Sequence, residues 1–182
     1  MADIRVSNIK VSLKSNLRKG PPLDLKAKEV KNFWVYRGED NSRGKEQRTF
    51  VYIIFPRGHI NITGIKRIKH IAEAKGHLSK QIRKTIKNFK IIKCNIDSIS
   101  AHGRLSKNEI SLWQLAKTEH SHPIIKSVEF DPCTFPALKI FTSIGTALIF
   151  SNGKCNLTGC KNLTQVQTLY FICKSIFDTR TV

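Results

Sequence analysis

The sequence contains an internal repeat, and this repeat limits the folds open to the chain more than any other feature. Residues 53–65 read IIFPRGHINITGI and residues 148–160 read LIFSNGKCNLTGC. The shared residues lie at one constant spacing along the chain: Phe55, Gly58, Asn61, Thr63 and Gly64 recur as Phe150, Gly153, Asn156, Thr158 and Gly159. A constant spacing of this kind indicates that one supersecondary unit occurs twice in the chain.

Each copy has the pattern of a β-hairpin followed by a helix. An apolar run leads into Arg57-Gly58 in the first copy and into Asn152-Gly153 in the second, where glycine supplies the positive φ of a tight turn. The alternating run after each turn predicts the second strand. Apolar residues near helical spacing then predict long helices within residues 65–86 and 162–177.

The front of each half matches less closely but has the same order of elements. Residues 7–9 (Ser-Asn-Ile) resemble residues 94–96 (Cys-Asn-Ile), and each triplet lies in a strand-like stretch. A short helix is predicted within 23–32 and another around 105–115, where Ser106 and Glu109 form a capping-box pattern. Residues 33–37 and 135–141 predict a further strand in each half.

The predicted fold class is therefore α+β, with residues 1–87 and 88–182 as two repeats of one pseudo-twofold domain. Each repeat has the order βαββββα, and the antiparallel strands are expected to form one continuous curved sheet. Helices that pack on only one face of such a sheet leave its other face open. We therefore expect the functional residues on the open face.

The balance of charge favours a polyanionic partner. The chain has 32 Lys and Arg against 13 Asp and Glu, a formal net charge of +19, which makes nucleic acid the leading candidate. No apolar run is long enough for a membrane-spanning helix, and the amino-terminal residues lack the apolar core of a signal peptide. The sequence thus predicts a nucleic-acid-binding protein that is not secreted and has no membrane partner.

The five cysteines include no CxxC pair and are interpreted as reduced thiols in strands and helices. Their spacing does not fit a structural zinc site, and the segment 119–122, with two histidines, is better explained as a solvated loop. We predict no metal and no cofactor. The acidic residues form no obvious carboxylate cluster and no zinc-deaminase signature occurs, so an enzyme acting on nucleic acid is disfavoured.

The second half carries a recognisable signature. FDPCTFPALKIF (130–141) followed by LIFSNGKCNLTG (148–159) resembles the second repeat of the TATA-box-binding protein family, which has an acidic-Pro-x-x-Phe-Pro stretch, then Leu-Ile-Phe-x-x-Gly-Lys and Leu-Thr-Gly. The first half offers IIFPRGHINITG and a Leu-Asp-Leu-Lys helix opening. The resemblance covers residues 4–177 and is that of a divergent or viral member. It implies a saddle-shaped domain with helices on the convex face and minor-groove DNA on the concave sheet face.

The resemblance also implies that two phenylalanine pairs wedge between base steps and bend the duplex. Phe135 and Phe150 match the pair of the second repeat, and Phe55 matches one member of the first-repeat pair. Phe33 is the expected partner of Phe55, with Trp34 as the alternative. Such a wedge has to be apolar, flat and rigid.

Polar residues with which the family reaches base edges have matches as well. Asn8 and Asn95 match the central asparagines, which hydrogen-bond to the adenine N3 and thymine O2 acceptors. Thr63 and Thr158 match positions where hydroxyl groups reach into the groove. We expect these four residues on the groove floor.

Four positions of the expected groove floor depart from the family. Asn61 and Asn156 stand where a small apolar residue is usual, and Lys10 and Asp97 stand where valine is usual. An amide oxygen accepts a hydrogen bond from the guanine amino group, so a relaxed or altered DNA motif is predicted in place of a strict A·T preference. Asn61 and Asn156 are therefore counted among the expected DNA-binding residues.

The stretch through which the family contacts transcription factor IIB survives in part, as Asp131 and Pro132. Cys133 and Thr134 replace an acidic and an apolar residue, which predicts a non-standard factor-IIB-like or polymerase-associated partner. The resemblance implies a non-enzymatic initiation factor in the nucleus, or in a viral replication and transcription compartment if the protein is viral. The alternative is an interaction protein or nucleic-acid-binding module of this fold that has lost sequence-specific DNA binding.

Overall fold

The computed structural model describes residues 4–40, 48–117 and 122–178 and divides into two compact units. The amino-terminal unit is residues 8–97, and the carboxyl-terminal unit is residues 98–182 together with residues 1–7. Each boundary falls within a long strand, β1 (Ile4–Ser15) or β6 (Ile91–Arg104), so both strands contribute residues to both units. No helix in the described part of the chain is long and apolar enough to cross a membrane.

The amino-terminal unit is built from short strands and one long helix. After β1 come the 3₁₀ turn η1 (Leu23–Leu25), β2 (Lys28–Val30), β3 (Phe33–Asp40), β4 (Arg48–Ile54), the 3₁₀ turn η2 (Pro56–Gly58), β5 (His59–Ile65) and α1 (His70–Arg83). The strands are hydrogen-bonded in the order β2-β3-β4-β5-β1-β6. The pairings from β2 to β1 are antiparallel.

The carboxyl-terminal unit repeats this order. β6 is followed by α2 (Leu112–Ala116), β7 (Ile125–Glu129), β8 (Ala137–Thr142), β9 (Thr146–Phe150), β10 (Lys154–Cys160) and α3 (Leu163–Asp178). The strand order is β1-β6-β10-β9-β8-β7, with antiparallel pairings from β6 to β7. The predicted order βαββββα is present twice, with η1 in place of the first short helix, and the α+β fold class is confirmed.

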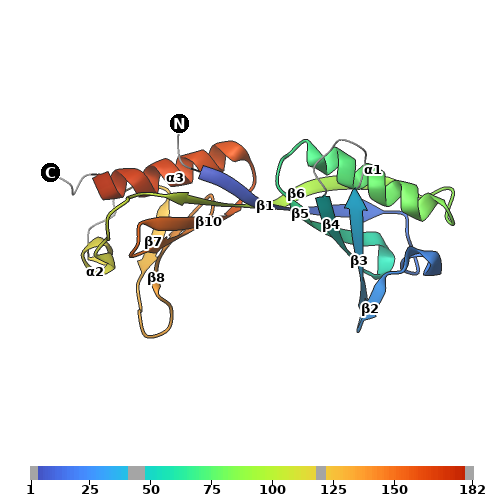
Figure 1. The fold of residues 1–182 in the computed structure, drawn as a ribbon, viewed down its shortest axis with the longest axis horizontal. Helices are drawn as coiled ribbons and strands as arrows, with labels where there is room; N and C mark the ends of the chain where they lie inside the picture. Colours follow the sequence, from blue (N-terminus) through green and yellow to red (C-terminus); the bar gives the residue numbers. More distant parts are fainter. Residues whose placement is uncertain (1–3, 41–47, 118–121, 179–182) are drawn as a thin grey trace. The chain divides into compact units, whose positions relative to one another are not determined.

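In each unit one long helix packs on one face of the strands (Figure 1). α1 buries Ala74, Leu78 and Ile82, which recur every four residues along one side of the helix. The Tyr52 hydroxyl of β4 donates a 2.9 Å hydrogen bond to the Ala74 carbonyl. Burial of each large aliphatic side chain stabilises the fold by about 1.5–3 kcal/mol. α3 packs in the same way through Val166, Leu169, Tyr170, Ile172 and Cys173.

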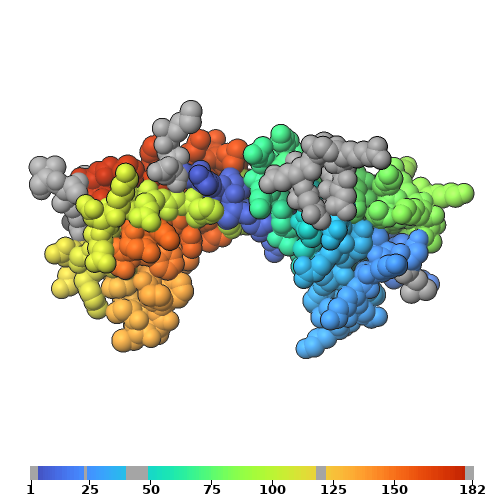
Figure 2. All heavy atoms as spheres, in the orientation of Figure 1, coloured from blue at the N-terminus to red at the C-terminus, as the bar shows by residue number. Residues whose placement is uncertain are grey.

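The connections between the outermost strands lie away from the long helices. Within the amino-terminal unit the β2–β3 turn is at the end opposite α1, and within the carboxyl-terminal unit the β7–β8 connection is at the end opposite α3 (Figures 1 and 2). Phe33 follows the first of these connections, and Phe135 is the next-to-last residue of the second. The strands therefore carry both aromatic residues to the helix-free side of their own unit.

The two hairpin glycines lie where no other residue fits without strain. Gly58 has φ +82° and Gly153 has φ +77°, the left-handed conformation predicted for these turns. A Cβ atom on Gly58 would lie 2.4 Å from the carbonyl oxygen of Ser15, and one on Gly153 would lie 2.2 Å from that of Ser106. In both units the hairpin turn thus packs directly on the backbone at the end of the first long strand.

All five cysteines are free thiols, and four of them lie in strands or helices as predicted, whereas Cys133 lies in a turn. Cys133 is exposed and Cys94 is half-buried, whereas the other three lie in the core of the carboxyl-terminal unit. Burial raises the pKa of Cys155 to about 11 and also raises the pKa values of Cys160 and Cys173. These three thiols are therefore protonated at neutral pH and act as small apolar side chains.

Candidate nucleic-acid interface

The strand face that the long helices leave uncovered is polar, and we call it the open face. Along β1 and β5 buried aliphatic residues alternate with residues that are at least partly exposed, so the two sets point to opposite sides of the sheet. The buried set packs towards α1. The open face of β1 and β5 consists of Asn8, Lys10, Ser12, Lys14, His59, Asn61 and Thr63.

Asn8, Thr63 and Gly64 form a hydrogen-bonded set on this face. Thr63 Oγ1 donates to Asn8 Oδ1 at 3.1 Å, and the Gly64 N–H donates to the same oxygen at 2.9 Å. Because both bonds use the amide oxygen, they fix the orientation of the Asn8 amide and leave its NH₂ group as the outward donor. Such a donor suits the N3 and O2 acceptors of the minor groove.

The predicted match between Asn8 and Asn95 is wrong in register. The residue that follows Asn8 pairs with Ile65 of β5. The equivalent of Ile65 in the hairpin repeat is Cys160, and Cys160 pairs with Ile99 of β6. Ser98, the residue before Ile99, therefore corresponds to Asn8, and Asn95 does not.

Ser98 takes the position that was expected for Asn95. The Gly159 N–H donates to Ser98 Oγ at 3.1 Å, in the same way as its counterpart does in the amino-terminal unit. Two residues further along β6, Ser100 Oγ is hydrogen-bonded to Thr158 Oγ1 at 3.2 Å. Asn95 itself is exposed, in the part of β6 that belongs to the amino-terminal unit.

The same shift in register moves Asp97 away from the expected groove-floor position. Its Oδ1 accepts a 2.7 Å hydrogen bond from Ser12 Oγ within the amino-terminal unit. Ser100, two residues after Ser98, is the residue that corresponds to Lys10. These corresponding positions are thus occupied by a lysine in one unit and by a serine in the other.

Asn61 and Asn156 occupy equivalent positions on the open face, as predicted from the repeat. Asn61 pairs with Ser12 of β1, and Asn156 pairs with His102 of β6. Asn61 is half-buried and Asn156 is exposed. Within the described residues, no hydrogen bond ties either amide, so each has both its donor and its acceptor available to a ligand.

Phe33 and Phe55 contact each other on the open face. Their ring centroids are 5.7 Å apart and their planes are inclined at 43°. Trp34 pairs with the buried Ile54 and therefore points to the helix side, where its ring would meet a Cβ atom on Gly20 at 2.7 Å. The alternative assignment of Trp34 as the partner of Phe55 is wrong, because Trp34 faces the other side of the sheet.

Phe135 and Phe150 form the second ring pair, with centroids 6.4 Å apart and planes at 58°. Lys139 Nζ lies 5.4 Å from the centroid of the Phe135 ring in a cation–π contact. The strand register pairs Phe150 with Ala137, and Phe135 lies two residues before Ala137 in the sequence. In the amino-terminal unit Trp34 pairs with Ile54, so the adjacent residues Phe33 and Phe55 are directly opposite each other. The two pairs are therefore built differently.

Asp131 organises the turn that leads to Phe135. Its carboxylate accepts hydrogen bonds from the Cys133 N–H and from Thr134 Oγ1, both at 3.0 Å. Its carbonyl oxygen accepts from the Phe135 N–H at 2.9 Å. Asp131 and Pro132 are both exposed, so they form surface that a partner can reach. The structural role of the Asp131 carboxylate was not evident from the sequence.

Cationic side chains accompany the polar residues of the open face. Lys10 and Lys14 of β1 and Lys154 of β10 are exposed. Arg104, opposite Lys154 in the β6–β10 pairing, is half-buried. Such a face attracts phosphate groups by a charge interaction that does not depend on base sequence.

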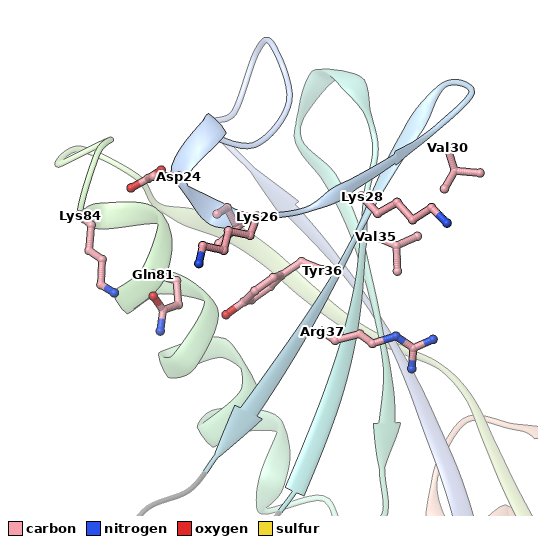
Figure 3. A pocket seen from close by; sticks show the side chains of 10 residues that line it. Asp24, Lys26, Lys28, Val30, Val35, Tyr36, Arg37, Gln81 and Lys84 are labelled. Carbon is pink, nitrogen blue, oxygen red and sulfur yellow. The ribbon is translucent and has the colours of Figure 1, made fainter.

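A cavity of about 860 Å³ lies at the sheet edge of the amino-terminal unit, where β2 ends and β3 continues (Figure 3). Its cationic lining consists of Lys26, Lys28, Arg37 and Lys84. The Tyr36 ring also lines it, and burial raises the pKa of that hydroxyl. None of the predicted site residues lines this cavity. No sequence motif indicated it, because its residues come from separate segments.

In the described part of the chain, no group of three or more His, Cys, Asp or Glu side chains is arranged to hold a metal ion. Of the segment considered above, Glu119 and His120 lie outside the described residues.

Comparison with known proteins gives a family match and a likeness of fold. The family model described as transcription factor TFIID, or TATA-binding protein (TBP), matches residues 93–177. Among solved structures, the Methanococcus jannaschii TBP superposes with a TM-score of 0.73 at 20% sequence identity, covering 97% of this chain and 99% of that chain. At this identity the likeness establishes the fold. No curated protein sequence matches the chain.

Proposed function

We propose that this chain, a TATA-binding-protein-like protein by its family match and its fold, binds the minor groove of promoter DNA, wedges phenylalanines between base steps and bends the duplex to recruit transcription machinery. The residues of the open face and the two ring pairs are the proposed DNA contacts. No chemical step is part of this function, because binding and bending alone supply the platform.

The observation that carries the proposal is the pair of phenylalanines on the helix-free side of each unit. Phe33 with Phe55 and Phe135 with Phe150 are half-buried pairs of apolar, flat rings. Parting one base step costs about a few kcal/mol, which a bent duplex offsets through the larger protein surface that it contacts. Two rings acting together enter a step as one rigid wedge, because each restricts the rotamers of the other.

The other groups on the open face of each unit supply contacts of the two kinds that minor-groove binding needs, to base edges and to phosphates. In the amino-terminal unit Asn8 offers an oriented NH₂ donor to base edges, and Asn61 and Thr63 add polar groups. In the carboxyl-terminal unit Asn156 and Thr158 add polar groups. The exposed lysines of β1 and β10 neutralise phosphates. This combination fits a protein that reads the groove while holding the backbone.

A protein partner is proposed for the exposed turn at Asp131 and Pro132, with a transcription factor or polymerase-associated protein as its class. The changes at Cys133 and Thr134 favour a non-standard factor-IIB-like partner. The proposed place of action is the nucleus, or the replication and transcription compartment of a virus if the protein is viral.

Alanine substitutions of the rings test the proposal directly. We expect Phe55→Ala and Phe150→Ala to lower affinity for a promoter duplex by roughly 100-fold in a band-shift assay, because a wedge ring normally contributes a few kcal/mol. Phe171→Ala is the matched control, since Phe171 lies on α3 with 58% of its surface exposed and is remote from the open face. Its affinity should stay within about threefold of the parent protein.

Fluorescence energy transfer across a labelled duplex separates wedging from electrostatic coating. The parent protein should bring the duplex ends together, and Phe150→Ala should reduce this bend. Binding that is unchanged in both ring variants would support the alternative of a protein that has lost specific DNA binding. Tight binding with no bend would contradict the wedge mechanism.

A further inference from the structure

We infer that the carboxyl-terminal unit accepts G·C base pairs in the minor groove where Ser98 and Ser100 face it, whereas the amino-terminal unit requires A·T pairs where Asn8 and Lys10 face it. The inference rests on the proposed function and concerns the specificity of the same open face. It derives from two pairs of corresponding positions, at which Asn8 and Lys10 in one unit are replaced by Ser98 and Ser100 in the other.

The amino-terminal unit presents only donors at these two positions. The Asn8 oxygen already accepts two hydrogen bonds, from Thr63 and Gly64, so its NH₂ group is what it offers to DNA. Lys10 is exposed, and an ammonium group has donors and no acceptor. The A·T minor groove shows acceptors only, so donors match it. The guanine amino group is itself a donor, and here it would meet two further donors on long side chains.

The carboxyl-terminal unit presents hydroxyl groups at the same two positions. Ser98 Oγ accepts from Gly159 N–H, and Ser100 Oγ shares one hydrogen bond with Thr158 Oγ1. A hydroxyl oxygen has two lone pairs and one proton. The hydrogen bond between Ser100 and Thr158 uses one proton and one lone pair, so the pair still offers a ligand one donor as well as acceptor lone pairs. The Asn156 amide and its equivalent Asn61 each add one donor and one acceptor, so they contribute equally to the two units and the difference rests on the serine positions.

This set matches the G·C minor groove in both chemistry and size. The guanine N2 amino group requires an acceptor, and the neighbouring N3 and O2 atoms require donors. Ser98 and Ser100 are also shorter than Asn8 and Lys10, which leaves space for the extra amino group. A wrong hydrogen-bond partner in a DNA site typically lowers affinity by roughly 10- to 100-fold, which is large enough to distinguish the two halves of a target.

Base analogues that change only the minor groove provide the test. A selection from random duplexes with the full chain first identifies a bound sequence. Each A·T pair of that sequence is then replaced by 2,6-diaminopurine·T, which adds the amino group, and each G·C pair by inosine·C, which removes it. We expect diaminopurine to change affinity by less than about threefold in one half of the site and to lower it roughly 10- to 100-fold in the other.

Variants assign the two halves of the site to the two units. Ser100→Val should extend the diaminopurine penalty to the tolerant half, with the penalty measured against the all-A·T duplex bound by the same variant. Lys10→Ser should reduce the loss of affinity that diaminopurine causes in the half of the site bound by the amino-terminal unit. Ser98→Asn is a second variant of the carboxyl-terminal unit, and a thermal melt followed by circular dichroism checks that each variant is folded.

The outcomes separate this inference from the proposed function. Equal diaminopurine penalties in both halves, with the A·T duplex still bound, would overturn the inference and leave the proposed function standing. The inference also fails if Ser100→Val and Ser98→Asn, both folded, leave the tolerant half unchanged. If the parent protein binds no duplex detectably, both the inference and the proposed function are overturned.

Discussion

The Asp131 carboxylate accepts hydrogen bonds from the Cys133 N–H and the Thr134 hydroxyl, and the turn that these bonds stabilise leads to Phe135. A charged acceptor in such a turn contributes roughly 1.5–3 kcal/mol per hydrogen bond when protected from water, and less at an exposed position such as this one. The turn determines how the backbone of Phe135 approaches β8, which begins at Ala137, and so where the ring points. Asp131 can therefore affect DNA binding without touching DNA.

We expect Asp131→Ala to lower affinity for a promoter duplex by roughly tenfold, because Phe135 then samples more orientations before it inserts. Asp131→Asn should retain most of the affinity, since an amide oxygen still accepts from the Cys133 N–H and the NH₂ group can donate to the Thr134 hydroxyl. Fluorescence anisotropy with a labelled duplex measures both. Equal affinities for the alanine variant and the parent protein would show that the residue serves only a partner contact.

Single residues also show where reasoning from the sequence succeeds and fails. The residues of the hairpin repeat, such as Asn61 and Asn156, lie at equivalent positions of the two hairpins because one constant spacing relates both strands of the hairpin. Ser98 was missed because the Asn95 triplet looked like the Asn8 triplet. The register is set by burial, and the buried Ile99 and Ala101 of β6 were the better signal.

At the level of elements, the hairpin turns give the clearest test of how the repeat is held together. Gly153→Ala would place a Cβ atom 2.2 Å from the Ser106 carbonyl oxygen at a φ of +77°. We expect it to lower the free energy of unfolding by about 2–4 kcal/mol through strain and displacement of the β10 hairpin. Urea unfolding followed by circular dichroism measures the change.

Gly76 of α1 provides a matched control for that substitution. Nothing lies within 4 Å of a Cβ atom built on Gly76, and the residue is within a helix. Gly76→Ala should therefore raise the free energy of unfolding by about 0.5–1 kcal/mol, because alanine has the higher helix propensity. A loss of stability in Gly76→Ala, or none in Gly153→Ala, would contradict the described packing.

The order of elements was predictable, but their lengths were less so. The long helix expected within 65–86 begins only at His70, and the first short helix is the three-residue turn η1. η1 stops at once because Lys26, its C-terminal cap, has a φ of +50° in the left-handed region. Apolar spacing locates the buried side of a helix but does not indicate where the backbone leaves the helical conformation.

On the scale of the whole molecule, the net charge of +19 makes binding to DNA strongly dependent on salt. If the open-face cations contact roughly four to eight phosphates, the logarithm of the binding constant should fall with the logarithm of salt concentration with a slope of about −4 to −7. Lys14→Ala should reduce the magnitude of this slope by about one. Anisotropy titrations between about 50 and 200 mM salt give the slopes.

A lysine outside the open face serves as the control for the salt experiment. Lys174 lies on α3, 3.4 Å from Asp178 in an ion pair. Lys174→Ala should leave the slope unchanged, because its charge is already balanced by a carboxylate and lies on the helix side. A slope that falls equally in both variants would indicate that binding depends on total charge and not on the open face.

The fold of the whole chain followed from its repeat, whereas the cavity at the β2–β3 edge did not. Two copies of one pattern predicted a duplicated antiparallel sheet because hairpin and helix signals are local in sequence. The cavity is lined by Lys26, Arg37 and Lys84, which come from three separate segments of the chain, and only tertiary packing creates such a set. The residues that line such a cavity are far apart in the sequence, so no sequence pattern indicates it.

The burial of the thiols gives the chain a ready attachment point for a spectroscopic label. Cys133 is exposed, whereas Cys155, Cys160 and Cys173 are buried and protonated at neutral pH. A maleimide dye will therefore react first at Cys133, two residues from the ring of Phe135, with half-buried Cys94 as the slower site. Replacing Cys94 by serine leaves one reactive position, so the entry of a single ring into a duplex becomes a fluorescence signal that can be followed in real time.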